Sequence, residues 1–282
     1  MIAINPIDVF LWTFRKNEKD VINLYNTLSP VMQIATGGTM LNFGYWSHQH
    51  LNPISAQENL CRVFGNLSEL STAKNAIDVG SGLSAPSKLW RDSYPELKLY
   101  DVNINFNQLS FLKYQENIQF INSSSTKLPF INNSVDRVLA LESAQHFKPL
   151  DDFIVESKRV LTPSGLLVMA VPIIVGDSSL GKLGLLKFTW SSEHYSLNYL
   201  KNLLISNGFK ITREILIGSN VYDPLADYYV ENRKTLSRTI LEHYPGYMEK
   251  ILYKSLLKMK KASQEKIIDY VLLKCSLNPD LE

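Results

Sequence analysis

From about residue 74 onward, short apolar runs rich in β-branched residues alternate with stretches whose apolar positions recur at helical spacing. This alternation is typical of a parallel sheet covered by helices on both faces. The runs predicted to be strands are residues 76–79, 97–104, 118–121, 135–141, 166–173, 209–217 and 267–274. The pattern therefore predicts a doubly wound α/β sheet of seven strands.

Two of the intervening stretches carry helix boundary signals. Ser84 is expected to cap a helix whose first turn contains Pro86, because proline is tolerated where the missing N–H has no intrahelical partner. Residues 151–161 are predicted to form a crossover helix, with Phe153 and Val160 on its apolar side. The Thr-Pro-Ser-Gly stretch at 162–165 is expected to end that helix and form a turn.

Two further segments do not follow this alternation. Residues 1–70 are rich in aromatic side chains and helical patterning but contain no convincing strand pair, and residues 220–266 form a lysine- and tyrosine-rich helical stretch before the last strand. We expect an amino-terminal helical cap or lid at 1–70, a sheet core made of 71–219 and 267–282, and a helical insertion at 220–266. Both helical segments could close over a ligand site, or they could simply cover apolar edges of the sheet.

Composition narrows the class of protein. With 282 residues, 45% of them hydrophobic and 20% charged, the chain can bury a core and is neither disordered nor fibrous. A formal net charge of +2 argues against a nucleic-acid or anionic-membrane partner. Cys61 and Cys275 fit no metal-ligand or secreted-disulfide spacing, and the first residues lack a basic leader or long apolar run. These features predict a cytoplasmic protein.

A glycine-containing turn joins the first predicted strand to the next helix. Gly80 and Gly82 flank Ser81, and glycine lets the backbone turn tightly and approach a ligand closely. The N–H groups that open the following helix can donate to an anionic group. A dinucleotide fingerprint would have a third glycine where Ala85 stands, so the motif alone also fits a turn without a ligand.

Other parts of the chain support a nucleoside site. Residues 103–108, Asn-Ile-Asn-Phe-Asn-Gln, follow the second strand, where ribose hydroxyls lie in a doubly wound sheet. The sequence KLPF at 127–130 precedes the fourth strand, and the sequence VDRVLALESAQHF at 135–147 contains that strand.

Together these stretches resemble the class I S-adenosylmethionine-dependent methyltransferases, which have a Rossmann-like fold. Within that group the chain is similar to small-molecule enzymes such as natural-product sugar O-methyltransferases, which carry an amino-terminal NxGYW element, here NFGYW at 42–46. The resemblance extends from about Asn42 to the last strand and is weak over the first forty residues and the insertion.

The resemblance implies a set of site residues. Asn103 and Ser124 stand where most of the superfamily has an acidic residue. The residues it implies for cofactor binding are Asp78, Gly80, Ser81 and Gly82 around the methionine half, Asn103, Ile104 and Gln108 at the ribose, Ser124 and Ser125 at the adenine, Leu141 and Glu142 beside the sulfonium, and Tyr45 and Gln57 in the part that closes over the cleft.

Methyl transfer to a hydroxyl also requires removal of a proton. His146 follows the fourth strand, beside the expected methyl position, and imidazole is a suitable base near neutral pH. Further residues expected to contact the acceptor are Trp46, Trp190, His194, Tyr195 and Tyr222. The sequence thus predicts methyl transfer from S-adenosyl-L-methionine to a small molecule, with S-adenosyl-L-homocysteine as product and no metal, in a protein whose cap could mediate a homodimer.

Three alternatives remain open at this point. The enzyme could methylate nitrogen or carbon, for which no such base is needed. The chain could be a methyltransferase-like binding protein without catalysis, as the residues at positions 103 and 124 suggest. A nucleotide-dependent dehydrogenase on the same sheet is disfavoured, because the usual acidic or basic residue at the adenosine ribose is absent.

Overall fold

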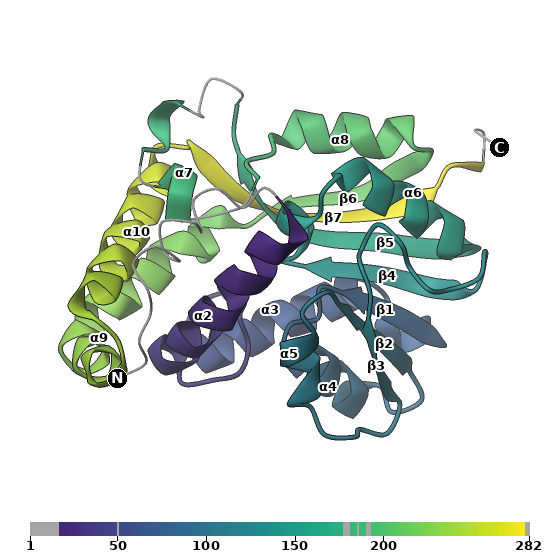
Figure 1. The fold of residues 1–282 in the computed structure, drawn as a ribbon. Coiled ribbons are helices and arrows are strands. Elements are labelled where there is room, and N and C mark those ends of the chain that lie inside the picture. Colours follow the sequence, from purple (N-terminus) through teal and green to yellow (C-terminus); the bar gives the residue numbers. More distant parts are fainter. Residues whose placement is uncertain (1–16, 50, 177–180, 185, 190–192, 280–282) are drawn as a thin grey trace.

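The computed structural model describes residues 17–49, 51–176, 181–184, 186–189 and 193–279, which are built around one seven-stranded sheet (Figure 1). The strands are β1 (Asn75–Val79), β2 (Lys98–Asn103), β3 (Ile118–Asn122), β4 (Val135–Leu141), β5 (Leu161–Ile174), β6 (Phe209–Leu216) and β7 (Ile268–Leu277). They lie in the order β3-β2-β1-β4-β5-β7-β6. Strands β1 to β5 are parallel, whereas β7 runs antiparallel between β5 and β6. The prediction of a doubly wound seven-stranded sheet is confirmed.

Helices cover both faces of this sheet (Figure 1). One buried cluster packs α3, α4, α9 and α10 against the sheet, and a second packs α6 and α8 against the opposite face. None of the helices within the described residues is both long and apolar enough to cross a bilayer. The helices are α2 (Glu18–Thr36), α3 (Pro53–Leu67), α4 (Ala85–Ser93), α5 (Phe106–Ser110), α6 (Leu150–Val160), α7 (Leu186–Thr189), α8 (Leu197–Ser206), α9 (Tyr222–His243) and α10 (Gly246–Gln264).

Two local predictions are wrong. Ser84 precedes α4 but makes no side-chain cap bond, because its backbone is left-handed (φ 60°) instead of the extended conformation that a capping serine needs. The stretch 162–165 is not a separate turn but lies within β5, which begins at Leu161. At this point Leu161 pairs with Val135 of β4. The register between the two strands then shifts, so that the next pair is Arg137 with Leu166.

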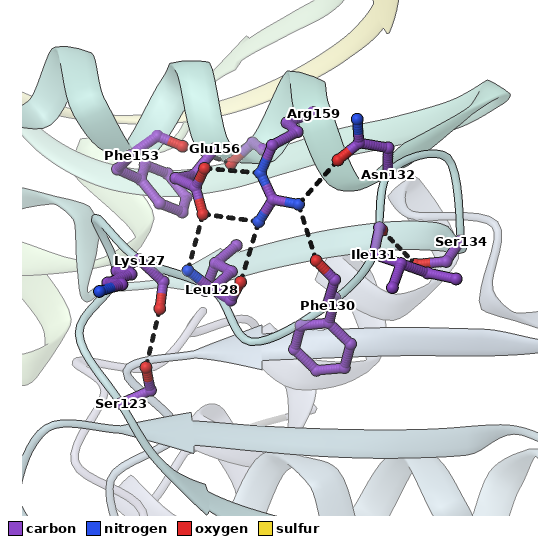
Figure 2. A network of polar contacts seen from close by, with 11 residues as sticks. Ser123, Lys127, Leu128, Phe130, Ile131, Asn132, Ser134, Phe153, Glu156 and Arg159 are labelled. Atoms are coloured by element: carbon purple, nitrogen blue, oxygen red, sulfur yellow. Dashed lines mark hydrogen bonds and ion pairs between the residues drawn. The ribbon is translucent and has the colours of Figure 1, made fainter.

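The loop between β3 and β4 is held by the carboxyl-terminal turn of α6 (Figure 2). Arg159 donates to the carbonyls of Leu128 and Phe130 at 2.9 and 2.7 Å, and Glu156 accepts from the amide of Leu128 at 2.8 Å. The two side chains also form an ion pair at 2.7 Å. Since Ser123 donates to the carbonyl of Lys127 at 2.8 Å, this network also fixes the chain that follows β3. That chain forms one wall of the cavity described next.

Candidate functional site

A cavity of about 1040 Å³, measured out to its open mouth, lies at the carboxyl ends of β1, β2 and β4. In a doubly wound sheet this is the position where the strand order reverses and neighbouring loops diverge. Helix α2 forms the opposite wall through four residues. The lining comes from Glu18, Val21, Ile22 and Tyr25, from 39–42, from the turn at 78–83 with Pro86, from 103–105 with Gln108, from Ser123 and Ser125, and from 141–143 and 146–148.

The glycine turn is fixed by its neighbours on both sides. The amide of Gly80 donates to the carbonyl of Val102 at 2.7 Å, which ties the turn to β2. Gly80 has φ 80°, and a Cβ built there would lie 2.5 Å from the Cβ of Ser143. Ser143 in turn donates to the carbonyl of Val79 at 2.6 Å. Only glycine fits this close approach between the ends of β1 and β4.

The turn also presents a hydrogen-bonding group toward the cavity. The hydroxyl of Ser81 is buried and has no hydrogen-bond partner among the residues that the structure describes. Buried hydroxyls normally have a partner, so a partner from a bound molecule fits this position. The glycine backbone and this hydroxyl therefore fit the nucleoside cofactor that the sequence implies.

Asn103 and Gln108, the residues predicted at the ribose, bond to each other. The amide nitrogen of Asn103 donates to the carbonyl of Gly82 at 3.1 Å and to Oε1 of Gln108 at 2.9 Å. Its oxygen accepts from the amide of Asn105 at 2.9 Å. Both amide hydrogens of Asn103 are thus used inside the protein, which leaves acceptor capacity on one oxygen.

Glu142 lies at the end of β4 with a left-handed backbone (φ 53°). Its Oε1 accepts from the amide of Phe43 and from the hydroxyl of Tyr270, each at 2.9 Å. Burial raises the pKa of Glu142 to about 8, although these two hydrogen bonds act in the opposite direction. A carboxyl group that lines a cavity and is protonated at neutral pH is poised to ionise when a positive charge binds beside it.

A second pair of acids lies behind the turn. Asp78 and Asp101 occupy paired positions on β1 and β2, both buried, and Ser87 donates to them at 3.3 and 2.5 Å. Burial raises the pKa of Asp101 to about 6, and burial together with the neighbouring Asp101 charge raises the pKa of Asp78 well above its usual range. The pair therefore retains a proton near neutral pH.

His146, the predicted base, lines the cavity at the end of a short 3₁₀ turn, Ala144–His146. Its Nε2 lies 2.8 Å from the hydroxyl of Tyr25, and the two rings meet edge to face with centroids 5.2 Å apart. Lys148, two residues further along, also lines the cavity and forms an ion pair with Glu193 at 2.5 Å. One side of this cavity therefore carries an imidazole, a phenol and an ammonium group.

Helix α2 supplies functional groups that sequence reasoning missed. Besides Tyr25, the helix contributes Glu18, which accepts a hydrogen bond from Ser124. It also contributes Ser29, whose hydroxyl accepts from the side-chain amide of Gln108 at 3.1 Å. A further bond joins Asn105 to Asn26 on the same helix. Glu18, Tyr25 and Ser29 recur at spacings of seven and four residues, which places them on one helix face. This spacing could have indicated a polar face on the helix, but it does not indicate what that face contacts.

Most of the predicted cofactor residues line the cavity, but three do not. Gln57 donates to the carbonyls of Met40 and Asn42, at 3.1 and 2.7 Å, and so holds the 39–42 wall from behind. Tyr45 packs partly buried against the core, and Ser124 lies next to lining residues as the partner of Glu18. The predicted roles of these three residues in contacting the cofactor remain predictions.

Four of the five predicted acceptor residues are described by the structure, and these four lie outside the lining. Trp46 is buried and packs against Tyr228, and Tyr222 is fully buried with its hydroxyl donating to the carbonyl of Asp269. Tyr195 stacks on Tyr199. Two further residues complete this set: His194 is partly buried outside the cavity lining, and Trp190 falls outside the described residues.

Within the described part of the chain, no group of three or more His, Cys, Asp or Glu residues is arranged to hold a metal ion.

Comparison with known proteins adds the following findings. Residues 77–169 match the family model described as "Methyltransferase domain". Among curated proteins, erythromycin 3''-O-methyltransferase of Saccharopolyspora erythraea is 26% identical over 166 residues, covering 56% of this chain and 54% of that protein. The fatty-acid O-methyltransferase of Mycolicibacterium smegmatis is 26% identical over 135 residues, covering 44% of this chain and 49% of that protein. The chain thus spans about half the length of these relatives.

Solved structures share the fold over nearly the whole chain. The [4+2]-cyclase SpnF superposes with a TM-score of 0.78 at 17% identity, covering 92% of this chain and 96% of that one. The cyclopropane synthase MmaA2 of Mycobacterium tuberculosis gives a TM-score of 0.72 at 15% identity, covering 98% and 99%. At this level of identity the likeness concerns the fold.

Proposed function

We propose that this chain, which carries a methyltransferase domain of the class I S-adenosylmethionine-dependent fold at residues 77–169, methylates a hydroxyl group of a small molecule. One observation carries the proposal: the cavity is bounded at the same time by the glycine turn, the end of β2, Glu142 and His146. Such a cavity places a nucleoside site beside a candidate base.

The residues suited to hold the cofactor are those of the turn and of the strand ends. Gly80 and Ser81 offer a close backbone approach and a buried hydroxyl, while Asp78 and Glu142 offer carboxyl groups to positively charged atoms. The cofactor supplies a methyl group on a positively charged sulfur, an electrophile that needs no metal. The contribution of the protein is then alignment, which accounts for up to about 7–11 kcal/mol in favourable intramolecular reactions.

His146 serves as general base in this proposal. The imidazole would take the proton of the acceptor hydroxyl on Nε2. The bound cofactor would supply the methyl group, and its sulfur would keep the electron pair of the broken sulfur–carbon bond. Tyr25 bonds to this nitrogen, so the acceptor either displaces the phenol or passes its proton through it. In both cases the His146 ring is held at the edge of the cavity by a group from α2.

The acceptor is expected to be partly apolar. Val21 and Ile22 of α2, Leu41, Leu83 and Phe147 bring apolar side chains into the lining. The curated relatives include an erythromycin 3''-O-methyltransferase and a fatty-acid O-methyltransferase, and both acceptors are of this kind. In this account residues 1–70 and 220–266 serve as the cap and insertion around the core.

The test is transfer of labelled methyl from S-adenosylmethionine to small molecules in an extract of the source cell. With the labelled acceptor in hand, His146→Ala should lower kcat by about 10²- to 10⁴-fold while cofactor affinity stays unchanged. His243→Ala, at an exposed position at the end of α9, is the matched control. Full turnover of His146→Ala at neutral pH would instead indicate a nitrogen or carbon acceptor, and the base role would be wrong.

A second candidate is a protein of this fold that binds the cofactor without methyl transfer. SpnF, which is described as a [4+2]-cyclase, shares this fold, so the fold by itself does not establish methyl transfer. Tight binding of S-adenosylhomocysteine with no labelled product from any extract would support this candidate.

A further inference from the structure

The polar side chains at the predicted ribose position, after β2, mostly form hydrogen bonds within the protein. Asn103 uses both amide hydrogens on Gly82 and Gln108, and Gln108 in turn donates to Ser29. A nucleoside offers hydroxyl and amine donors, which need acceptors. The sheet alone leaves few of them at this end of the cavity.

A carboxylate from another element reaches the same end. Glu18, in the first turn of α2, lines the cavity and accepts from the hydroxyl of Ser124, in the chain that follows β3. A carboxylate has about four acceptor positions, so a single hydroxyl leaves capacity for a ligand. The other carboxyl groups in the described lining, Asp78 and Glu142, lie at the glycine turn and the end of β4.

The contact with Ser124 indicates which part of a nucleoside Glu18 would meet. The ribose side of the cavity is formed by Asn103 and Gln108 after β2, whereas Glu18 is bonded to the segment after β3, between the lining residues Ser123 and Ser125. The ribose lies between the base and the rest of the cofactor. A group on the β3 side is therefore placed to meet the base.

We propose that Glu18 is a cofactor-binding residue that accepts a hydrogen bond from the exocyclic amine of adenine. This inference rests on the proposed function and adds to it a residue from a helix outside the sheet. It also accounts for a neutral Ser124 in the segment after β3, because the acidic group there comes from α2. A charge-assisted bond of this kind gives affinity and also discriminates against bases that lack the amine.

The consequence is that one helix contacts both ends of the site. Glu18 lies at the adenine end and Tyr25, two turns later, bonds to His146. Binding of the cofactor would then hold α2 against the sheet and, with it, the Tyr25–His146 contact.

The test is calorimetric affinity for S-adenosylhomocysteine and for S-inosylhomocysteine, in which an oxygen replaces the amine. Wild type should prefer the adenosyl ligand by at least about 10-fold, and Glu18→Gln should weaken adenosyl binding by about 10- to 100-fold. The same variant should reduce the preference between the two ligands to less than about threefold.

Asp20→Asn is the matched control, because it removes a charge from the same helix turn. Asp20 is part of the capping box of α2 but does not line the cavity, so its loss should leave the preference unchanged. Unaltered affinity in Glu18→Gln, or an equal loss for both ligands, would overturn the inference while the proposed function stands. Absence of any binding to wild type would instead remove the proposed function, and this inference with it.

Discussion

The hydroxyl of Tyr25 lies 2.8 Å from Nε2 of His146, and this bond joins α2 to the turn that follows β4. The two residues are far apart in the sequence, and both line the cavity. The position of the imidazole therefore depends on the docking of an amino-terminal helix.

Replacing Tyr25 with phenylalanine should lower kcat by about 2- to 10-fold, the range expected for the loss of one hydrogen bond. Affinity for S-adenosylhomocysteine should stay within about twofold, because the bond that this variant loses goes to His146. Steady-state kinetics and calorimetry measure the two quantities. Unchanged kcat, or a parallel loss of kcat and affinity, would show that the contact has no separate role in turnover.

Gly80→Ala should abolish detectable binding of S-adenosylhomocysteine and lower the melting temperature. The new Cβ would lie 2.5 Å from Ser143, at a φ of 80° that strains any residue with a side chain. Gly181→Ala is the matched control, because a Cβ there meets no atom of the described residues within 4 Å. Retention of affinity by Gly80→Ala would place the ligand elsewhere.

The preference for S-adenosylmethionine over S-adenosylhomocysteine should increase with pH. Burial holds the pKa of Glu142 at about 8, and a sulfonium bound beside this group would lower that pKa. Binding of the charged ligand then releases a proton, so it tightens as the pH rises toward 8 and levels off above it. The ratio of the two dissociation constants should change by up to about 10-fold per unit of pKa shift.

Glu142→Gln should make that ratio independent of pH. The two ligands carry the same amino-acid group, so its titration cancels in the ratio. Calorimetric titrations at pH 6, 7, 8 and 9 supply the values. A pH dependence that persists in the glutamine variant would assign the titration to another group.

Asp101→Asn should stabilise the protein more at pH 8 than at pH 4.5. The pKa of Asp101 is raised to about 6 in the folded state, so its contribution to stability is complete below the unfolded-state value near 3.9. That contribution is lost as the pH rises through 6. The amide oxygen can still accept from Ser87.

Calorimetric scans at both pH values measure the difference in melting temperature between Asp101→Asn and wild type. This difference should shift in favour of the variant by a few degrees between pH 4.5 and pH 8. A difference between the two proteins that does not vary with pH would mean that Asp101 ionises normally in the fold.

Much of the fold could be predicted because its signals are local. The apolar run at 135–141 coincides with β4, and the helical periodicity at 220–266 corresponds to α9 and α10. The stretch 162–165 does not form the predicted turn: Pro163 and Gly165 usually mark a turn, but here both lie in the irregular first part of β5.

The site could be predicted in part for the same reason. The glycine turn and the residues after β2 and β4 have fixed positions relative to their own strands, so their approach to one cavity follows from the topology. The contacts of Glu18 and Tyr25 with Ser124 and His146 depend on how α2 docks over a hundred residues away, and no local pattern encodes that docking. An aromatic ring suits both a ligand site and a core, so the sequence alone does not decide between these two roles for Trp46, which is buried in the structure.

We expect the cavity at the ends of β1, β2 and β4 to bind S-adenosylmethionine and its product. Calorimetric titration of the wild-type chain with S-adenosylhomocysteine at pH 7.5 tests this expectation most directly. Wild type should give saturable heat with one ligand per chain. Gly80→Ala should abolish this heat, and Gly181→Ala should retain it. No heat with wild type, or equal binding by the two glycine variants, would contradict it.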